Sequence, residues 1–120
     1  EVLKAAATGQ LAELKPLEWK EGYAVTVVLA AEGYPASPRK GDAITSPDLE
    51  DPAKILHAGT ATSPNGIVSN GGRVLNVLGQ GATLEEARAQ AYDVLGRIEL
   101  EGSFFRTDIG ARAAAGEISI

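Results

Sequence analysis

The chain has 120 residues, a formal net charge of −5 at pH 7, one histidine and no cysteine. This length suits one domain with a buried core, while the lack of cysteine excludes disulfide bonds and thiolate metal sites, and a single histidine excludes a multi-histidine metal site. The acidic balance argues against nucleic acid or an anionic membrane as the main partner, and no apolar run approaches the roughly 20 residues needed to cross a bilayer.

The first residues predict a helix and a connector. Residues 2–7 are rich in alanine with helix-compatible spacing, and Gly9 is the expected C-terminal cap. Residues 11–21 form a connector in which Trp19, the only tryptophan, is expected to be a core or interface anchor. Because no signal peptide is visible and residue 1 is Glu rather than Met, we expect a cytoplasmic protein and a fragment of a longer chain.

A strand is predicted over residues 23–31, where the apolar character is nearly continuous. Such a run favours a strand that is covered on both faces. The Gly-Tyr-Pro run at 33–35 ends it. Residues 35–53, rich in proline and other turn residues, then predict a long loop in which Ile44 is a candidate start of a very short strand.

Three further apolar runs predict strands. Residues 54–61 form the first, and the turn signal Ser-Pro-Asn-Gly at 63–66 returns the chain through residues 67–69, which makes a hairpin. Residues 73–78 are expected to extend that hairpin into a meander.

The clearest helix signal covers residues 83–98. Thr83 is the expected N-cap, and Glu86 three residues later completes a capping box. An apolar stripe recurs at helical spacing and is expected to face the sheet; it consists of Leu84, Ala87, Ala91, Val94, Leu95 and Ile98.

Two short elements follow, and the whole pattern indicates a fold class. Residues 98–102 predict a short strand or turn, and residues 111–115 a short helix capped by Thr107 or Asp108. The sequence therefore predicts an α+β fold: a small, mostly antiparallel sheet of meanders and hairpins, one main helix packed on it, and short terminal helices.

One corner of the predicted sheet has the residue types of an anion site. Asn70, Gly71 and Gly72 form a turn that leads into the strand at Arg73. Adjacent glycines allow positive φ and let a backbone or ligand approach closely. An arginine at the start of the strand can bind a carboxylate or phosphate through two parallel N–H groups. We expect these four residues to form the functional corner.

The other motifs have simpler explanations. Gly79-Gln80-Gly81 lies between a strand and a helix, but the third glycine of a dinucleotide site is replaced by Leu84. Lys40-Gly41-Asp42 lacks the context of a phosphate-binding P-loop, which favours a solvated lysine. His57 has no nucleophile motif beside it and is expected to be structural. Arg106 and Asp108 suggest a local ion pair and a cap, and no pair of carboxylates stands out as acid and base.

Four runs, in this order and spacing, resemble a known family. They are Gly33-Tyr34-Pro35 with Lys40-Gly41-Asp42-Ala43-Ile44, His57-Ala58-Gly59-Thr60, Ser69-Asn70-Gly71-Gly72-Arg73-Val74-Leu75-Asn76-Val77, and Arg106-Thr107-Asp108-Ile109-Gly110. Together they resemble the C-terminal domain of the phosphoribosylamine–glycine ligases, also called glycinamide ribonucleotide synthetases. The resemblance covers roughly residues 19–114. Residues 1–18 resemble the trailing end of that family's ATP-grasp region, which makes residues 19–120 the C-terminal domain.

The resemblance implies an activity for the full-length chain. The family joins glycine to 5-phosphoribosylamine in purine biosynthesis, with ATP and Mg²⁺ or Mn²⁺ handled mainly by the upstream ATP-grasp region. A fragment without that region and the N-terminal domain, its expected partners, is expected to be inactive and to hold no catalytic residue, metal or nucleotide of its own. The resemblance makes the corner at residues 70–73 the candidate site for the ribose phosphate. His57 is expected beside it, with Lys40 and Arg106 as weaker candidates.

Two alternatives remain at this stage. The first is a stand-alone small-ligand-binding or docking module that keeps the fold without the reaction; solvent exposure of Trp19 and of the N-terminal helix would favour the ligase fragment instead. The second is the analogous domain of a biotin-dependent carboxylase, which fits the architecture but not the four runs.

Overall fold

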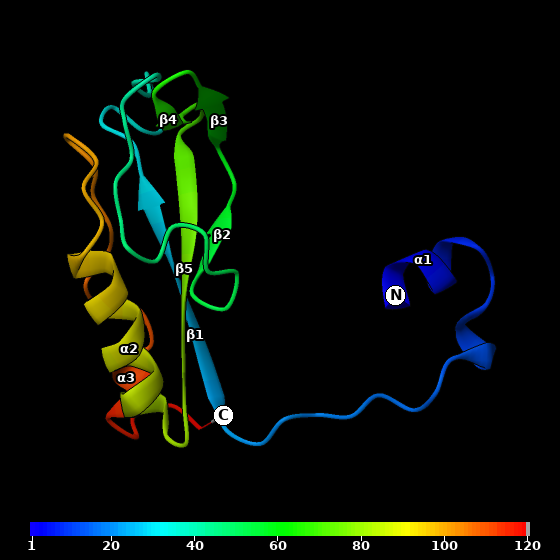
Figure 1. Cartoon of the computed structure of the whole chain (residues 1–120). Helices are drawn as coiled ribbons and strands as arrows, with labels where there is room; N and C mark the ends of the chain where they lie inside the picture. The colour runs from blue at the N-terminus through cyan, green and yellow to red at the C-terminus, as the bar shows by residue number, and fades with distance from the viewer. Residues whose placement is uncertain (120) are drawn as a thin grey trace.

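A three-stranded antiparallel sheet forms the centre of the computed structural model, which describes residues 1–119 (Figure 1). Its strands are β1 (Tyr23–Ala30), β5 (Arg73–Gly81) and β2 (Ile55–His57), in the order β1-β5-β2. The sequence correctly predicts an α+β fold with a mostly antiparallel sheet. The expected meander is wrong, however, because β5 pairs with β1 and β2 and not with the preceding hairpin.

That hairpin forms a separate two-stranded sheet at one end of the molecule. It comprises β3 (Thr60–Ser63) and β4 (Gly66–Ser69), joined by the predicted turn. The single strand expected over residues 54–61 is therefore wrong: the chain pairs with β5 in β2 and then leaves it. The break occurs where the carbonyl oxygen of Val74 accepts hydrogen bonds from the amides of both Ala58 and Gly59, at 3.1 and 2.9 Å.

The main helix, α2 (Leu84–Gly96), packs on β5 and β1. Its N-terminus is capped as predicted, since Thr83 Oγ1 accepts from the Glu86 amide at 3.2 Å, although the Glu86 carboxylate accepts from the amide of Ala82 rather than from Thr83. Most of the predicted apolar stripe is buried against the sheet. The glycine at position 79 explains the close contact, because a Cβ there would lie 2.0 Å from the Ala87 carbonyl oxygen.

Within residues 1–119, only one face of the sheet is covered. Along β1, Val25, Val27 and Leu29 are buried, whereas the intervening residues, among them Val28, are exposed. The expectation that both faces would be covered is therefore wrong for this chain. α2 covers the core face, and the opposite, open face reaches solvent (Figure 1). Burial alternates along β1, but the sequence does not show this because apolar residues occupy the exposed positions as well as the buried ones.

The long loop after β1 follows the hairpin edge as far as Ile44. The Ile44 amide donates to the Ile67 carbonyl oxygen at 3.0 Å, and Ala43 forms an isolated bridge with Val68. Further along, Thr45 forms an isolated bridge with Glu99, in the segment predicted as a short strand or turn. Ile44 is itself buried. The predicted short strand is thus reduced to isolated bridges.

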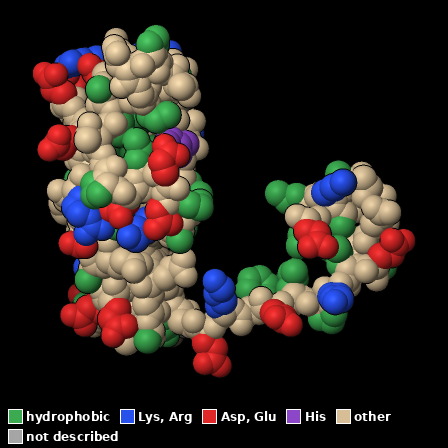
Figure 2. Space-filling model, in the orientation of Figure 1, with side chains coloured by type: hydrophobic (Ala, Val, Ile, Leu, Met, Phe, Trp, Pro, Cys, Tyr) green, Lys and Arg blue, Asp and Glu red, His purple; other side chains and the backbone are tan. Residues whose placement is uncertain are grey.

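The chain before β1 projects away from this body (Figure 1). It contains α1 (Val2–Ala7) and the short 3-10 helix η1 (Leu11–Glu13). The C-cap residue of α1 is Thr8 rather than the predicted Gly9, which follows it at φ +72°. Trp19 is 85% exposed and Leu3 86% exposed. Figure 2 shows hydrophobic side chains distributed along this arm. Within residues 1–119, no helix has the length and apolar character needed to cross a membrane.

The last helix, α3 (Ala111–Ala114), is present but is not capped as predicted. Neither Thr107 nor Asp108 provides a side-chain cap, and Gly110 at φ +69° is the N-cap residue instead. The Asp108 carboxylate binds the Arg106 guanidinium, with Oδ1–Nε and Oδ2–Nη2 distances of 2.9 and 2.7 Å. The carboxylate therefore serves the predicted local ion pair rather than the helix.

Candidate functional site

A β-bulge in β5 turns Arg73 onto the open face of the sheet. Leu75 pairs with Leu29, and Arg73 pairs with Ala30, which leaves Val74 as the extra residue. Both Val74 and Leu75 are fully buried, so the strict alternation of side chains breaks at this point. Without the bulge, Arg73 would lie on the core face with Leu75. With it, Arg73 lies on the open face.

Close backbone approach explains the glycines around this bulge. A Cβ at Gly59 would lie 2.6 Å from the Arg73 carbonyl oxygen, and a Cβ at Gly72 would lie 2.3 Å from ring atom Cδ2 of Tyr34. Neither Gly71 nor Gly72 has positive φ. The close approach predicted at these glycines is therefore present, whereas the positive φ predicted for the glycine pair is not.

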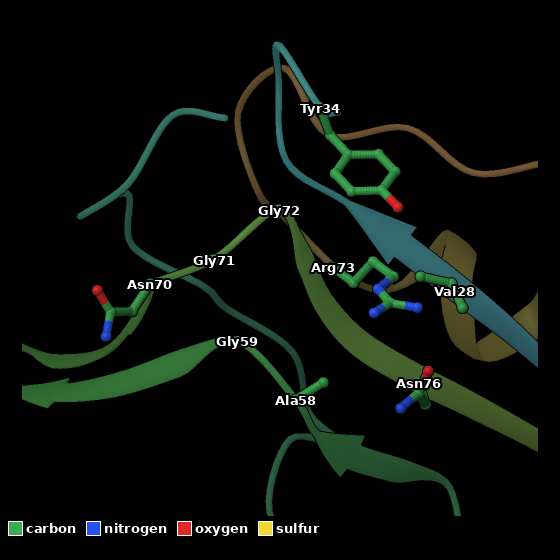
Figure 3. Close-up of a pocket in the computed structure, with 9 residues that line it drawn as sticks. All are labelled: Val28, Tyr34, Ala58, Gly59, Asn70, Gly71, Gly72, Arg73 and Asn76. Atoms are coloured by element: carbon green, nitrogen blue, oxygen red, sulfur yellow. The ribbon is translucent and has the colours of Figure 1, made fainter. Parts of the chain in front are cut away.

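The corner borders a shallow hollow of about 690 Å³ (Figure 3). All four residues expected to form the corner line it, together with residues from β1, β5 and the 34 and 58–59 loops: Val28, Tyr34, Ala58, Gly59, Asn70, Gly71, Gly72, Arg73 and Asn76. Three polar side chains lie along its open-face side, and in Figure 3 the Arg73 guanidinium lies between the Tyr34 ring and Asn76. The hollow can thus offer a cation and neutral hydrogen-bonding groups to one ligand.

Arg73 differs from the other arginines in having no partner. Within residues 1–119, its side chain makes no hydrogen bond or ion pair, whereas every other arginine binds a carboxylate or a backbone carbonyl oxygen. Those are Arg39 with Glu32, Asp42 and Glu101, Arg88 with the carbonyls of Thr107 and Ile109, Arg97 with Asp48 and Asp93, Arg106 with Asp108, and Arg112 with Glu117. A guanidinium with all its donors free beside a hollow is ready to bind an oxyanion.

A second, apolar hollow of about 250 Å³ adjoins the first. The two share Val28, Tyr34 and Arg73, and the second is completed by Ala30, Phe104, Phe105 and Arg106. Arg106 is therefore near the corner, as expected, but it is already bound. Its hydrogen bonds with Asp108 raise the pKa of Arg106 and lower the pKa of Asp108. A ligand anion would compete with Asp108 for this guanidinium.

The two remaining candidates lie outside both hollows. His57 is held by two contacts: Nδ1 lies 3.0 Å from Thr60 Oγ1, and Nε2 lies 3.0 Å from the Leu49 carbonyl oxygen. These contacts support the structural explanation of the histidine. Lys40 is exposed in the loop and makes no side-chain hydrogen bond within the described part of the chain. Neither residue lines a hollow that contains Arg73.

Tyr34 and Asn76 belong to the runs that carry the family resemblance, but the sequence did not predict them as site residues, although both line the hollow. A signal existed for Asn76, because asparagine is depleted in strands and this one interrupts an apolar run. Tyr34 offered no such signal, since its position depends on the glycine at 72 that its ring covers. In residues 1–119, no group of three or more His, Asp or Glu side chains is placed to hold a metal ion.

Comparison with known proteins identifies the family. Residues 24–112 match the family described as "Phosphoribosylglycinamide synthetase, C domain". The chain belongs to this family. The resemblance deduced from the four sequence runs is thereby confirmed, and the small sheet with one covering helix is the fold of a phosphoribosylglycinamide synthetase C domain.

The relatives of this C domain are much longer proteins. Phosphoribosylamine–glycine ligase of Corynebacterium ammoniagenes is 67% identical over 119 residues, which cover 99% of this chain and 28% of the relative. The Mycobacterium bovis protein of the same name is 54% identical and is likewise covered to 28%. A crystal structure of phosphoribosylamine–glycine ligase from Thermotoga maritima is 41% identical in sequence and superposes with a TM-score of 0.74. The match covers 91% of this chain and 27% of the Thermotoga chain. The chain thus spans little more than a quarter of the relatives that it matches.

Proposed function

We propose that this C domain is part of a cytoplasmic ligase of purine biosynthesis, which joins glycine to 5-phosphoribosylamine at the expense of ATP. The names and the high identity of the relatives support this activity. Residues 1–18 would belong to the trailing end of the upstream ATP-grasp region, and residues 19–120 would form the C-terminal domain. The family match begins at residue 24, and the exposed apolar arm before it is consistent with that division.

Within that ligase, we assign the corner at Asn70, Gly71, Gly72 and Arg73 to the phosphate of phosphoribosylamine. The observation that carries this assignment is the guanidinium of Arg73, which has no partner within residues 1–119 and borders the 690 Å³ hollow. A phosphate accepts two parallel N–H groups from arginine, with both geometry and charge matched.

The role of this corner in the reaction is positioning. By fixing the phosphate end of phosphoribosylamine, Arg73 would restrict the orientations of the amine at the other end of the sugar, where the new bond forms. Holding a reactant in a productive geometry can remove a large share of an activation barrier. The resemblance to the ligase family assigns ATP and its Mg²⁺ or Mn²⁺ mainly to the upstream ATP-grasp region, where ATP would supply the activation of the glycine carboxylate.

The test is the substitution Arg73→Ala in the intact ligase. Loss of a charge-assisted phosphate contact should raise KM for phosphoribosylamine by about 10- to 100-fold, with KM for ATP and for glycine nearly unchanged. Arg73→Lys should recover only part of the loss, because lysine keeps the charge but not the planar pair of donors.

A matched control is Arg112→Ala. Arg112 is an exposed arginine whose only side-chain partner within residues 1–119 is Glu117, at 3.2 Å, and it lines neither hollow. Its removal should leave all three KM values unchanged. Equal effects of Arg73→Ala on the KM values of ATP and phosphoribosylamine would contradict the assignment of the phosphate to this corner.

A further inference from the structure

We infer that Tyr34 and Asn76 recognise the sugar of the ligand whose phosphate Arg73 binds, so that this face selects a ribose phosphate over other phosphate monoesters. The inference rests on the proposed function. It is based on the arrangement of three side chains on the open face of the sheet, which Figure 3 shows as a row of Tyr34, Arg73 and Asn76.

Asn76 supplies the neutral polar group of this row. On the central strand β5, it pairs with Val28 of β1 on one side and with Leu56 of β2 on the other, so it has an apolar residue on each side. Its side chain makes no hydrogen bond with any other residue in the range 1–119. An amide offers both a donor and an acceptor, which is the complement of a sugar hydroxyl group that also has both.

Tyr34 supplies a flat wall on the other side of Arg73. Its ring lies directly over Gly72, where any Cβ would collide with it, and it borders both hollows. Its hydroxyl group makes no hydrogen bond within residues 1–119. A tyrosine ring exposes an apolar face with a polar end. That combination suits a sugar, whose C–H groups pack on the ring while its hydroxyl groups need partners.

A ligand that satisfies all three side chains must carry both a phosphate group and hydroxyl groups. A simple phosphate monoester can bind Arg73, but it leaves Asn76 without a partner. A ribose phosphate can place its phosphate on Arg73 and its hydroxyl groups on the Asn76 amide, with Val28 and the Tyr34 ring beneath the sugar. Buried or half-buried polar groups that only one ligand satisfies discriminate strongly against the other.

The experiment measures inhibition of the intact ligase, competitive with phosphoribosylamine, by ribose 5-phosphate and by propyl phosphate. Propyl phosphate has the phosphate but no sugar hydroxyl groups. Asn76→Leu keeps the branched heavy-atom shape of the side chain and removes the amide, and Tyr34→Leu removes the ring. Each substitution should raise the inhibition constant of ribose 5-phosphate by about 5- to 10-fold and leave that of propyl phosphate within about twofold. Tyr34→Phe, which retains the ring, should lose less affinity for ribose 5-phosphate than Tyr34→Leu does.

Arg73→Ala separates this inference from the proposed function. It should weaken both inhibitors together, because both present a phosphate. If Arg73→Ala weakens both while Asn76→Leu and Tyr34→Leu leave their ratio unchanged, the sugar assignment is overturned and the phosphate corner stands. If Arg73→Ala affects neither inhibitor, the phosphate corner itself is wrong and the sugar assignment fails with it.

Two further variants guard against effects on folding. Asn76→Ser is a smaller polar replacement that is compatible with the same strand position, and it should retain more of the preference for ribose 5-phosphate than Asn76→Leu does. Thr26→Ala alters an exposed residue of β1 on the same open face that lines neither hollow, and it should leave both inhibition constants unchanged. A ratio that falls equally in Thr26→Ala would overturn the inference.

Discussion

Gly72 in the corner and Gly59 beside it differ in what surrounds them, and this difference can be measured residue by residue. At Gly59 an added Cβ meets backbone atoms, the Arg73 carbonyl oxygen at 2.6 Å and Gly71 Cα at 3.0 Å. At Gly72 it meets the ring of Tyr34, which is a side chain able to rotate away. Backbone collisions are the more costly of the two, because β2 and β5 would have to separate.

We therefore predict that Gly59→Ala lowers the free energy of unfolding by about 1–3 kcal/mol, the range found for overpacking, whereas Gly72→Ala costs less. Gly72→Ala should instead displace Tyr34 and weaken ribose 5-phosphate binding. Chemical denaturation of the two variants measures the difference.

Gly96→Ala is the control, since nothing lies within 4 Å of the added Cβ and the helical φ is permissive. It should be neutral or stabilising by about 0.4–1 kcal/mol. A Gly59→Ala variant as stable as Gly96→Ala would contradict the close-approach argument.

At the scale of an element, α2 holds the loop at residues 106–109 in addition to covering the core. Arg88 Nε donates to the Ile109 carbonyl oxygen at 2.7 Å, and Tyr92 Oη both donates to the Arg106 carbonyl oxygen at 2.7 Å and accepts from the Ile109 amide at 3.2 Å. The Arg88 guanidinium also lies 5.2 Å from the centre of the Tyr92 ring. The helix thereby fixes the backbone that places Arg106 at the rim of the apolar hollow.

We predict that Tyr92→Phe loosens this loop selectively. The ring and its packing on Phe105 are kept, but the hydroxyl group that bonds both ends of the loop is lost. Hydrogen exchange of the Ile109 amide should become about 5- to 10-fold faster, as expected for one lost hydrogen bond of ordinary strength. Exchange of the Ala31 amide, which donates to the Gly72 carbonyl oxygen, should be unchanged. Equal acceleration at both amides would indicate global destabilisation instead.

A buried carboxylate connects the long loop to the opposite end of the same helix. Asp48 is only 7% exposed; Lys54 Nζ lies 2.8 Å from Oδ1, and Arg97 Nε and Nη2 lie 2.9 and 2.7 Å from Oδ2. The hydrogen bonds from Lys54 and then Arg97 lower the pKa of Asp48 below its ordinary value of 3.8. Because the folded pKa is the lower one, the carboxylate stabilises the fold above pH 3.8, and this contribution is lost as the pH falls through the folded pKa.

Asp48→Asn should therefore lower the thermal stability at neutral pH, and the gap to the unsubstituted chain should narrow as the pH falls below 3.8. Thermal unfolding followed by circular dichroism between neutral and strongly acidic pH measures this gap. Glu117→Gln is the control, because its partner Arg112 is exposed and such pairs contribute little. A gap that stays constant with pH would show that the effect of Asp48 is not electrostatic.

The elements that the sequence predicts well are those determined by local patterns. The helix at α2 follows from its apolar stripe and its Thr83 cap, and the β3–β4 hairpin follows from its turn residues. The bulge at Val74 could not be predicted, because it depends on Ala58 and Gly59 of another segment bonding to the same carbonyl oxygen. The same limit applies to the site: Arg73 was identifiable by its residue type and its glycines, whereas Tyr34 reaches it only through tertiary contact.

At the scale of the whole molecule, the body and the N-terminal arm follow different physical rules. The body buries a continuous core between the sheet and α2, which includes Val27, Leu75 and Val94. Hydrophobic side chains are visible along the arm in Figure 2, and the exposed ones include Leu3, Leu17 and Trp19. Apolar side chains that remain in water contribute nothing to folding stability. The arm should therefore neither stabilise the body nor report on its unfolding.

This separation is testable because Trp19 is the only tryptophan. In the chain of residues 1–120, acrylamide should quench Trp19 fluorescence almost as strongly when the protein is folded as when it is unfolded. During urea denaturation, the circular dichroism signal of the sheet and helix should change cooperatively, while the Trp19 emission maximum stays nearly constant. Deleting residues 1–21 should shift the midpoint by no more than the equivalent of about 0.5 kcal/mol, the range for surface changes.

A Trp19 emission shift that coincides with the dichroism transition would mean that the arm packs on the body in solution. The open face of the sheet, with the exposed Val28 and Leu56 beside Asn76, would then be the surface to examine for that contact.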